Sequence, residues 1–212
     1  STPYYRRGCL SLPSPRRPLS APKNIQIYNK SEHSLTLEEL YLKPIIKWDE
    51  KITNRWTVSE KAAQQRLDEF VLDELQDYRD GRNFPDKANV SRLSPYLHFG
   101  QISPNTAWYR ALDASALIAN EKSLDTFLSE LGWREFSYYL LYHFPHLPHK
   151  NLQSKFDAFP WPKTQASILR LWKSGKTGYP LVDAGMRELY STGYMHNRVR
   201  MVVGSFLVKN LL

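Results

Sequence analysis

The stretch GKTGYPLVDAGMRELYSTGYMHNRVRMVVGSFLVKNLL, from Gly175 to Leu212, decides the class of fold. Gly193 is expected to end one helix, because glycine readily adopts the left-handed conformation that follows a helix C-terminus. From Tyr194 onward, apolar residues recur with the 3.6-residue period of a half-buried helix. These residues are Met195, Val199, Val202, Val203 and Phe206. The stretch therefore predicts two consecutive helices.

Polar side chains crowd the first turns of the second of these helices. Asn197 and Arg200 are three residues apart and share a face, whereas Arg198 is expected to point elsewhere. One helix can therefore offer an amide to one ligand group and cations to two others. Runs of charge usually lie on solvated helix faces, and the residues alone leave that reading open.

The rest of the chain is also predicted to be helical. Thr57 and Glu60 have the spacing of a capping box, and Ser94 and Ser103 each precede a proline, which favours a helix start. We find no alternating strand-like run of useful length and no internal repeat. Helices are expected over residues 57–81, 104–116, 123–143, 164–172 and 179–190. The predicted fold is all-α.

Residues 1–55 differ from the remainder in their proline content. Pro3, Pro13, Pro15, Pro18 and Pro22 occur at a density that prevents regular structure, so we expect an extended interdomain linker. Residues 56–212 then form the helical domain. The chain begins without Met and ends inside an apolar helical pattern, and we expect both ends to be cut from a longer protein.

The net charge of +8 is unevenly distributed. A basic stripe is the electrostatic footprint of phosphate binding, although many intracellular proteins are basic for other reasons. Residues 150–176 contain Asp157 as their single acidic residue and six cations, namely Lys150, Lys155, Lys163, Arg170, Lys173 and Lys176. The distribution favours a nucleic-acid partner without establishing one.

The composition also bounds compartment and metal chemistry. Cys9 is the single cysteine, which excludes an internal disulfide framework and a cysteine-based zinc site, and we expect no metal. No run approaches the ~18 apolar residues of a membrane span, and no signal peptide is visible. We expect a reducing compartment, the bacterial cytoplasm or nucleoid.

Candidate phosphate-binding residues lie before Pro95. The Gly-rich fingerprints of Rossmann and P-loop sites are absent. Ser91 to Ser94 precede a helix start, where free backbone N–H groups and the positive end of the helix dipole favour an anion. Ordinary capping of that helix by Ser94 is the alternative interpretation.

Three long motifs, in this order, resemble signatures of the DNA photolyase/cryptochrome family. They are SRLSPYLHFGQISP from Ser91 to Pro104, ELGWREF from Glu130 to Phe136, and TGYP to TGYMHNRVRM from Thr177 to Met201. The MHNR run resembles class I cyclobutane pyrimidine dimer photolyases. Relatives that act on 6-4 lesions typically carry a His pair here, and plant-type cryptochromes tend to carry Asp at the position of Asn197.

The resemblance implies the N-terminal part of a helical FAD-binding domain of photolyase type. It implies light-driven repair of cyclobutane pyrimidine dimers in DNA by electron transfer from reduced FAD, the reaction of a deoxyribodipyrimidine photo-lyase. It also implies an antenna chromophore, folate or deazaflavin, in an α/β domain that precedes Ser1. The implied partner is dimer-containing DNA, with no membrane and a monomeric intact protein.

The resemblance further assigns roles to residues of this chain. Val90 departs from class I relatives, which often carry a hydroxyl there. The cofactor-binding residues are Tyr78, Val90, Ser91, Arg92, Leu93, Ser94 and Arg200. The DNA-binding residues are Arg82, Glu130, Leu131, Gly132, Trp133, Arg134, Glu135, Phe136, Ser137, Asn197 and Arg198.

Glu130, Trp133 and Arg134 are expected on one helix. Glu130 and Trp133 share a face, and Glu130 and Arg134 have the spacing of an ion pair. The alternative to a lesion pocket is a surface salt bridge beside a core tryptophan. An indole to stack on and a carboxyl to hydrogen-bond base edges suit a flipped pyrimidine dimer, and base flipping is the known mode of photolyases. Glu130 is therefore also a catalytic candidate.

Trp161 lies between two prolines in a stretch too broken for helix packing. A loop tryptophan is more often a hydrophobic plug. By resemblance, Trp161 is the solvent-side member of the family's three-tryptophan electron-transfer chain, and the other members are expected beyond Leu212.

Two other functions stay open. A cryptochrome-type blue-light photoreceptor binds the same flavin but signals instead of repairing DNA, and a basic helical nucleic-acid-binding module would hold no cofactor. We expect the isolated 212-residue chain to bind FAD weakly or not at all, to aggregate through its exposed apolar face, and to lack repair activity.

Overall fold

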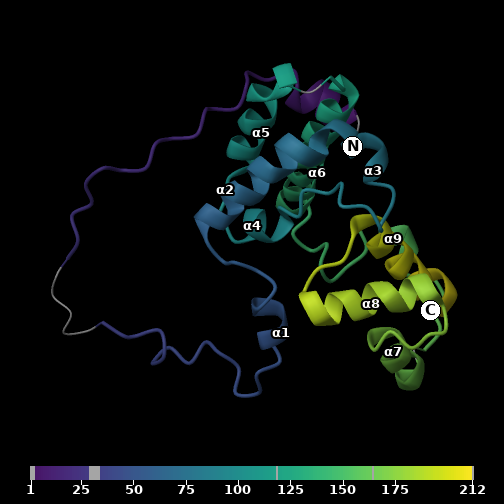
Figure 1. Ribbon diagram of the computed structural model, residues 1–212. Helices are drawn as coiled ribbons and strands as arrows, with labels where there is room; N and C mark the ends of the chain where they lie inside the picture. The colour runs from purple at the N-terminus through teal and green to yellow at the C-terminus, as the bar shows by residue number, and fades with distance from the viewer. Residues whose placement is uncertain (1–2, 29–33, 118, 164, 212) are drawn as a thin grey trace.

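The computed structural model describes residues 3–28, 34–117, 119–163 and 165–211, and every regular element in these ranges is helical. The predicted all-α class is therefore confirmed for the described residues (Figure 1). The α-helices are α1 (Glu50–Thr53), α2 (Glu60–Glu69), α3 (Tyr78–Gly81), α4 (Ser94–His98), α5 (Pro104–Asp113), α6 (Glu121–His143), α7 (Ala166–Lys173), α8 (Pro180–Thr192) and α9 (Asn197–Phe206). Shorter turns are the π-helical η1 (Tyr4–Cys9), η2 (Phe70–Glu74) and η6 (Leu207–Leu211) and the 3-10 helical η3 (Leu75–Asp77), η4 (Ser115–Leu117) and η5 (Ser154–Phe156).

The segment before α2 is irregular over most of its length but not wholly extended as predicted. Residues 15–17 contact α5, where the side-chain amide of Asn105 donates to the carbonyl of Arg16 at 2.8 Å. The residues that follow, up to 28, run away from the helices (Figure 1). The segment nevertheless starts with η1, where Tyr5 is buried, and Arg6 pairs with Asp125 of α6 at 2.7 Å between Nη2 and Oδ2. Most of the prolines follow η1, so they do not prevent this turn from packing on α6. The division into a linker and a helical domain at residue 55 stays a prediction.

Two of the predicted helix starts are wrong by a residue or two. The N-cap of α2 is Ser59, whose extended backbone lets its hydroxyl accept from the N–H of Ala62 at 3.0 Å; Thr57 makes no such bond. At α4, Ser94 is the first helical residue and Leu93 the N-cap, with no side-chain capping bond. Ordinary capping by Ser94 is therefore not its role in this structure.

Two other boundaries agree with the sequence, whereas the starts of α6, α7 and α9 differ from those expected. Ser103 caps α5 by accepting from the N–H of Thr106, and Gly193 ends α8 in the left-handed conformation at φ 71°. The long helix α6 starts at Glu121, two residues earlier than expected, and Asn120 caps it. In contrast, α9 starts only at Asn197, and α7 starts at Ala166 while Thr164 lies outside the described residues.

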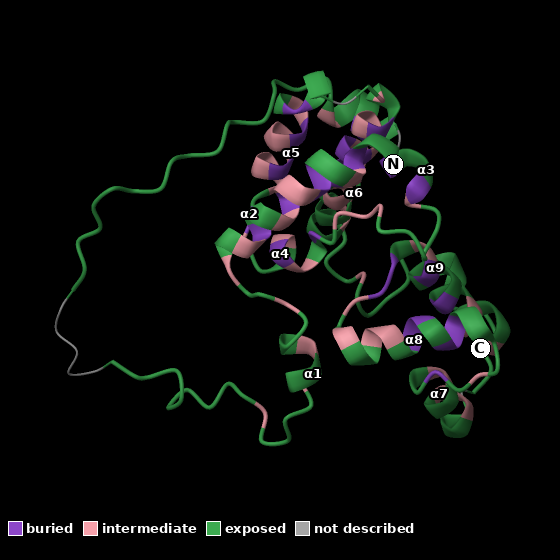
Figure 2. Cartoon of the chain, in the orientation of Figure 1, coloured by how far each residue is buried: buried purple, intermediate pink, exposed green. Residues whose placement is uncertain are grey.

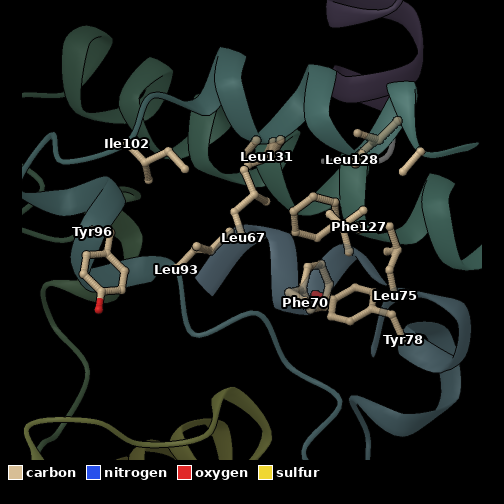
Figure 3. Packing of buried hydrophobic residues seen from close by; sticks show 14 of the residues in the cluster. Leu67, Phe70, Leu75, Tyr78, Leu93, Tyr96, Ile102, Phe127, Leu128 and Leu131 are labelled. Atoms are coloured by element: carbon tan, nitrogen blue, oxygen red, sulfur yellow. The ribbon is translucent and has the colours of Figure 1, made fainter. Parts of the chain in front are cut away.

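The larger hydrophobic core lies between α2, η2, α3, α4, α5 and α6. Its centre is Phe70, whose ring meets Tyr78 at 5.4 Å and Phe127 at 4.9 Å between centroids (Figure 3). Such tilted and edge-to-face contacts add to the free energy gained by burying the rings. This packing fixes α3, a single turn of helix, against the long helix α6.

A smaller core lies between α8 and α9, and the partly buried Trp172 of α7 packs against it. Figure 2 shows buried residues on α8 and α9, whereas α7 carries none. Gly185 of α8 meets Val199 and Val203 of α9, and any Cβ at this glycine would overlap them. Trp172 of α7 completes the unit by donating from its indole N–H to the carbonyl of Val203 at 3.3 Å. The absence of a side chain at residue 185 therefore sets how closely α8 and α9 approach.

Trp56 joins the two cores. Its ring packs against the larger core and lies 6.1 Å from the ring of Tyr194, between centroids. Its indole N–H donates to the carbonyl of Thr192, at the end of α8, at 2.7 Å. The end of α8 and the start of α9 are thereby held against the larger core.

We expect Gly185→Ala to lower the free energy of unfolding by about 1–3 kcal/mol, the usual cost of overpacking a core. The matched control is Gly204→Ala, because a Cβ at residue 204 of α9 meets no atom of the described chain within 4 Å. That change should be neutral or stabilise by up to about 1 kcal/mol, since alanine is the better helix former. Denaturant unfolding of the full-length protein measures both, and equal stability of the two variants would contradict the close approach of α8 and α9.

Candidate functional site

A cavity of about 270 Å³ lies where the two cores meet. Three parts of the chain line it: α3 with the loop before α4, one position of α6, and the connection from α8 into α9. The lining residues are Tyr78, Arg82, Val90, Ser91, Arg92, Leu93, Ser94, Glu130, Tyr194, Met195, His196, Asn197, Arg198 and Arg200. The structure thus gathers every residue predicted for the cofactor with four predicted for DNA.

The loop before α4 is held in an unusual conformation. Arg92 has φ 53°, the left-handed region that residues other than glycine rarely adopt. Arg66 of α2 supports the loop by donating from Nε to the carbonyl of Ser91 at 2.9 Å, and its own guanidinium is held by Glu74 at 2.6 Å. Strained residues of this kind cluster at functional sites. Arg92, in this unusual conformation, lines the cavity.

Glu130 pairs with Arg82, the C-cap of α3, and not with Arg134 as its spacing predicted. The distance from Arg82 Nη1 to Glu130 Oε1 is 2.6 Å, and the two side chains are 11% and 32% exposed. Arg134 instead contacts Glu135 and the hydroxyl of Tyr138. Ion pairs gain strength where solvent is excluded, so the more buried partner from another helix prevails over the helical neighbour.

Tyr78 forms the buried wall beside this ion pair. The Arg82 guanidinium lies over its ring at 5.2 Å from the centroid. Burial raises the pKa of Tyr78 to about 12, so the phenol stays neutral at physiological pH. The wall therefore offers a ring and a neutral hydroxyl.

Asn197, Arg198 and Arg200 at the start of α9 line the same cavity. Arg198 and Arg200 nevertheless make different contacts, because Arg200 Nη2 donates to the carbonyl of Met195 at 3.5 Å. Arg198 reaches across to the loop after α3, where its Nε donates to the side-chain oxygen of Asn83 at 2.9 Å. The bond links the start of α9 to the loop after α3. Spacing along one helix could not reveal a contact between such distant parts of the chain.

Sequence reasoning missed His196, the N-cap of α9. Its Nδ1 accepts from the backbone N–H of Arg198 at 3.1 Å, and the residue is 4% exposed. Its Nε2 is buried without a hydrogen-bond partner among the described residues. Burial lowers the pKa of His196 below its ordinary value. The available signal was a histidine at a position that Ser, Thr, Asp or Asn usually fills.

The cavity is electropositive. Arg82, Arg92, Arg198 and Arg200 surround it, and Glu130, already paired with Arg82, is the one acidic residue of the lining. The Arg92 guanidinium also lies over the ring of Tyr194, 5.0 Å from the centroid. Guanidinium groups and backbone N–H groups at a helix start favour anions, and exposed ring faces favour planar groups. The cavity suits a ligand that combines the two.

The predicted DNA-binding run from residue 130 to residue 137 does not form one surface, because it turns through more than two turns of α6. Leu131, Arg134 and Ser137 line a more apolar cavity of about 560 Å³ that shares Tyr78 and Glu130 with the first. Gly132 and Glu135 face another pocket under η1, where Tyr5 covers Gly132. Trp133 and Phe136 line neither cavity; their rings meet edge to face at 5.9 Å, and Trp133 is 48% exposed.

Trp161 lies apart from these cavities. It is 50% exposed, in an irregular segment, and its ring contacts that of Phe159 at 4.7 Å between centroids. It lines none of the pockets described above. Its position at the surface suits exchange of electrons with the solvent side better than a role as a hydrophobic plug of the core.

The described part of the chain contains no group of three or more His, Cys, Asp or Glu side chains placed to hold a metal ion. No helix within it has the length and apolar character needed to cross a membrane.

Comparison with known proteins reveals extensive similarity. Residues 127–212 match the family described as the FAD binding domain of DNA photolyase. The chain is 42% identical, over its full length, to a deoxyribodipyrimidine photo-lyase of Agrobacterium fabrum and covers 44% of that protein. It is 41% identical over 76% of its length to cryptochrome-2 of Arabidopsis thaliana, of which it covers 27%.

Among solved structures, a bacterial class III photolyase from Agrobacterium tumefaciens superposes with a TM-score of 0.92 and 42% identity. The match covers 100% of this chain and 43% of that one. A cryptochrome from Synechocystis superposes with a TM-score of 0.68 at 36% identity. That match covers 74% of this chain and 33% of the cryptochrome. The chain thus spans less than half the length of these relatives.

We expect stability to depend on the protonation of His196. Its folded pKa lies below the ordinary value of 6.5, so the unfolded chain binds a proton that the folded chain excludes. Stability is then fully present above pH 6.5 and is lost as pH falls towards the folded pKa. Thermal unfolding of the full-length protein between about pH 5 and 8 measures this. His196→Asn, which does not titrate, should show a smaller loss, and an unchanged pH profile would contradict the assignment.

Proposed function

The chain belongs to the DNA photolyase/cryptochrome family, and we propose that it takes part in light-driven repair of cyclobutane pyrimidine dimers in DNA. The observation that carries the proposal is the cavity of about 270 Å³ in which all the predicted cofactor-binding residues meet four of the predicted DNA-binding residues. The proposal concerns a full-length deoxyribodipyrimidine photo-lyase, because the chain spans 44% of the Agrobacterium fabrum relative. We base the assignment to class I on the MHNR run, whereas the similar Agrobacterium tumefaciens structure is described as class III.

The lining residues fit FAD, which combines an anionic diphosphate with two planar ring systems. Arg92, Ser91 and Ser94 offer a cation and hydroxyls to phosphate, and Tyr78 and Tyr194 offer ring faces. The buried Nε2 of His196 lacks the partner that a bound group could provide. Val90 lacks the hydroxyl that class I relatives often have, so one hydrogen bond to the cofactor is absent. Bound reduced FAD would supply light-driven one-electron transfer to the dimer.

We assign the remaining residues to DNA. Glu130, oriented by its ion pair with Arg82, can accept hydrogen bonds from the edge of a flipped base, and Asn197 can donate or accept beside it. Arg198 and Arg82 can pair with phosphates. The half-exposed ring of Trp133 is available for stacking on the lesion. Trp161 is assigned to electron transfer at the surface, because its indole is half exposed.

The other assignments follow from the same proposal. Residues 56–212 form the first half of the helical domain, after a linker over residues 1–55. An antenna chromophore, folate or deazaflavin, belongs to the preceding domain of the intact protein, which acts as a monomer in the cytoplasm on DNA.

A blue-light photoreceptor is the second candidate, and the similarity to Arabidopsis cryptochrome-2 favours it. The presence of Asn197 and of a Trp133 open to solvent favours repair instead. A basic nucleic-acid-binding module without cofactor is the third.

Repair by the full-length protein decides among them. We expect blue light and reduced flavin to restore thymines in an oligonucleotide that carries one dimer, with turnover abolished in the dark. Flavin binding without repair would indicate the photoreceptor. Binding of DNA by a protein that retains no flavin would indicate the module.

We expect Arg198→Ala to weaken binding of dimer-containing DNA and to lower the slope of log affinity against log salt by about 0.9, the value for one lost phosphate contact. Asn83→Ala is the matched control, because it breaks the same internal hydrogen bond but leaves the cation. Filter binding at several salt concentrations measures both. If the control reproduces the change in slope, Arg198 acts through the loop after α3 and not on phosphate.

A further inference from the structure

We propose that His196 is a binding residue for the cofactor, whose Nε2–H donates a hydrogen bond to an acceptor atom of FAD in the cavity. The inference rests on the proposed function, and it adds a residue that the motifs did not assign. It starts from one buried atom that the described chain leaves without a partner.

The proton of His196 is placed by its local contacts. A neutral imidazole has one acceptor nitrogen and one donor nitrogen. Because Nδ1 accepts from the backbone N–H of Arg198, the proton must be on Nε2. Burial also disfavours the doubly protonated ring. His196 therefore presents a single, fixed N–H donor.

This donor has no acceptor within the described residues. Buried polar groups are nearly always hydrogen-bonded, and each exception calls for a specific reason. The charged groups around the ring are Glu188, Arg198, Arg82 and Arg92, and none of them bonds to Nε2. His196 lines the cavity, so a bound molecule can supply the acceptor.

The surroundings favour an acceptor that carries negative charge. His196 is the N-cap of α9, a helix of 10 residues whose positive dipole end faces the same cavity. Arg82 and Arg92 add positive charge near the ring. An oxygen or nitrogen atom of an anionic ligand is therefore the acceptor that this position stabilises.

Burial identifies the cofactor, and not DNA, as that ligand. His196 is 4% exposed, whereas the candidate DNA contact Trp133 is 48% exposed. Duplex DNA is bulky and reaches the rim of a cavity, and a flipped base enters only after leaving the stack. We therefore assign the buried Nε2–H of His196 to a cofactor bound inside the cavity.

Two substitutions distinguish the roles of the two ring nitrogens of His196. His196→Asn keeps an acceptor close to the position of Nδ1, and asparagine is among the best N-caps, but it removes the donor at Nε2. His196→Gln extends an amide N–H group towards the position of Nε2 and is a poorer cap. The exposed His149 provides the matched control His149→Asn.

The experiment titrates the full-length apoprotein with FAD and follows flavin fluorescence, with thermal unfolding of the apoprotein alongside. We expect His196→Asn to unfold at the parental temperature and to bind FAD about fivefold to tenfold more weakly, as for a typical lost hydrogen bond. We expect His196→Gln to unfold at a lower temperature with an FAD affinity closer to that of the parent. His149→Asn should change neither quantity.

Parental FAD affinity in His196→Asn would overturn the proposal and leave the residue as a helix cap. The same holds if that variant binds FAD normally but loses affinity for dimer-containing DNA, since the acceptor would then be on DNA. If His196→Asn does not fold, a His196→Gln protein that binds FAD no better than Arg92→Ala overturns it as well. A parent protein that binds no FAD would contradict the proposed function itself, a result distinct from these.

Discussion

The contact of Phe70 with Tyr78 and Phe127 is the constraint on which the rest of the structure depends. It joins η2, α3 and α6 through rings 4.9–5.7 Å apart between centroids. α3 is one turn long and has no stability of its own, since short helices need tertiary packing. This packing, together with the bond from the N–H of Arg79 to the hydroxyl of Ser123, holds the turn against α6, where Arg82 meets Glu130.

The site is formed where two separate cores meet. The larger core supplies α3, α6 and the loop before α4, and the smaller core supplies the start of α9. Trp56 and the bond from Arg198 to Asn83 hold the two together at this junction. Neither core contains the site by itself, which explains why the candidate cofactor and DNA residues come from distant parts of the chain.

Ion pairs and hydrogen bonds hold the charged residues of the site in place. Arg66, fixed by Glu74, holds the backbone at Ser91, and this holds Arg92 in the left-handed conformation. Arg82 is fixed by Glu130. Fixed cations lose less conformational entropy when an anion binds than flexible surface side chains do. Cations fixed in this way favour one orientation of an anionic ligand, whereas flexible surface cations attract anions without orienting them.

The sequence by itself determined the all-α class, the end of α8 at Gly193 and the start of α5 at Ser103, because helical periodicity and these caps are properties of a few neighbouring residues. Its motifs also indicated the family and most of the cavity lining. Only the tertiary structure decided that Glu130 pairs with Arg82, 48 residues away, and that η1 packs on α6. It also left Trp133 outside the cavity that Glu130 lines, and His196 Nε2 without a partner among the described residues. These outcomes depend on which buried groups meet after helices pack, and spacing along one helix does not contain that information.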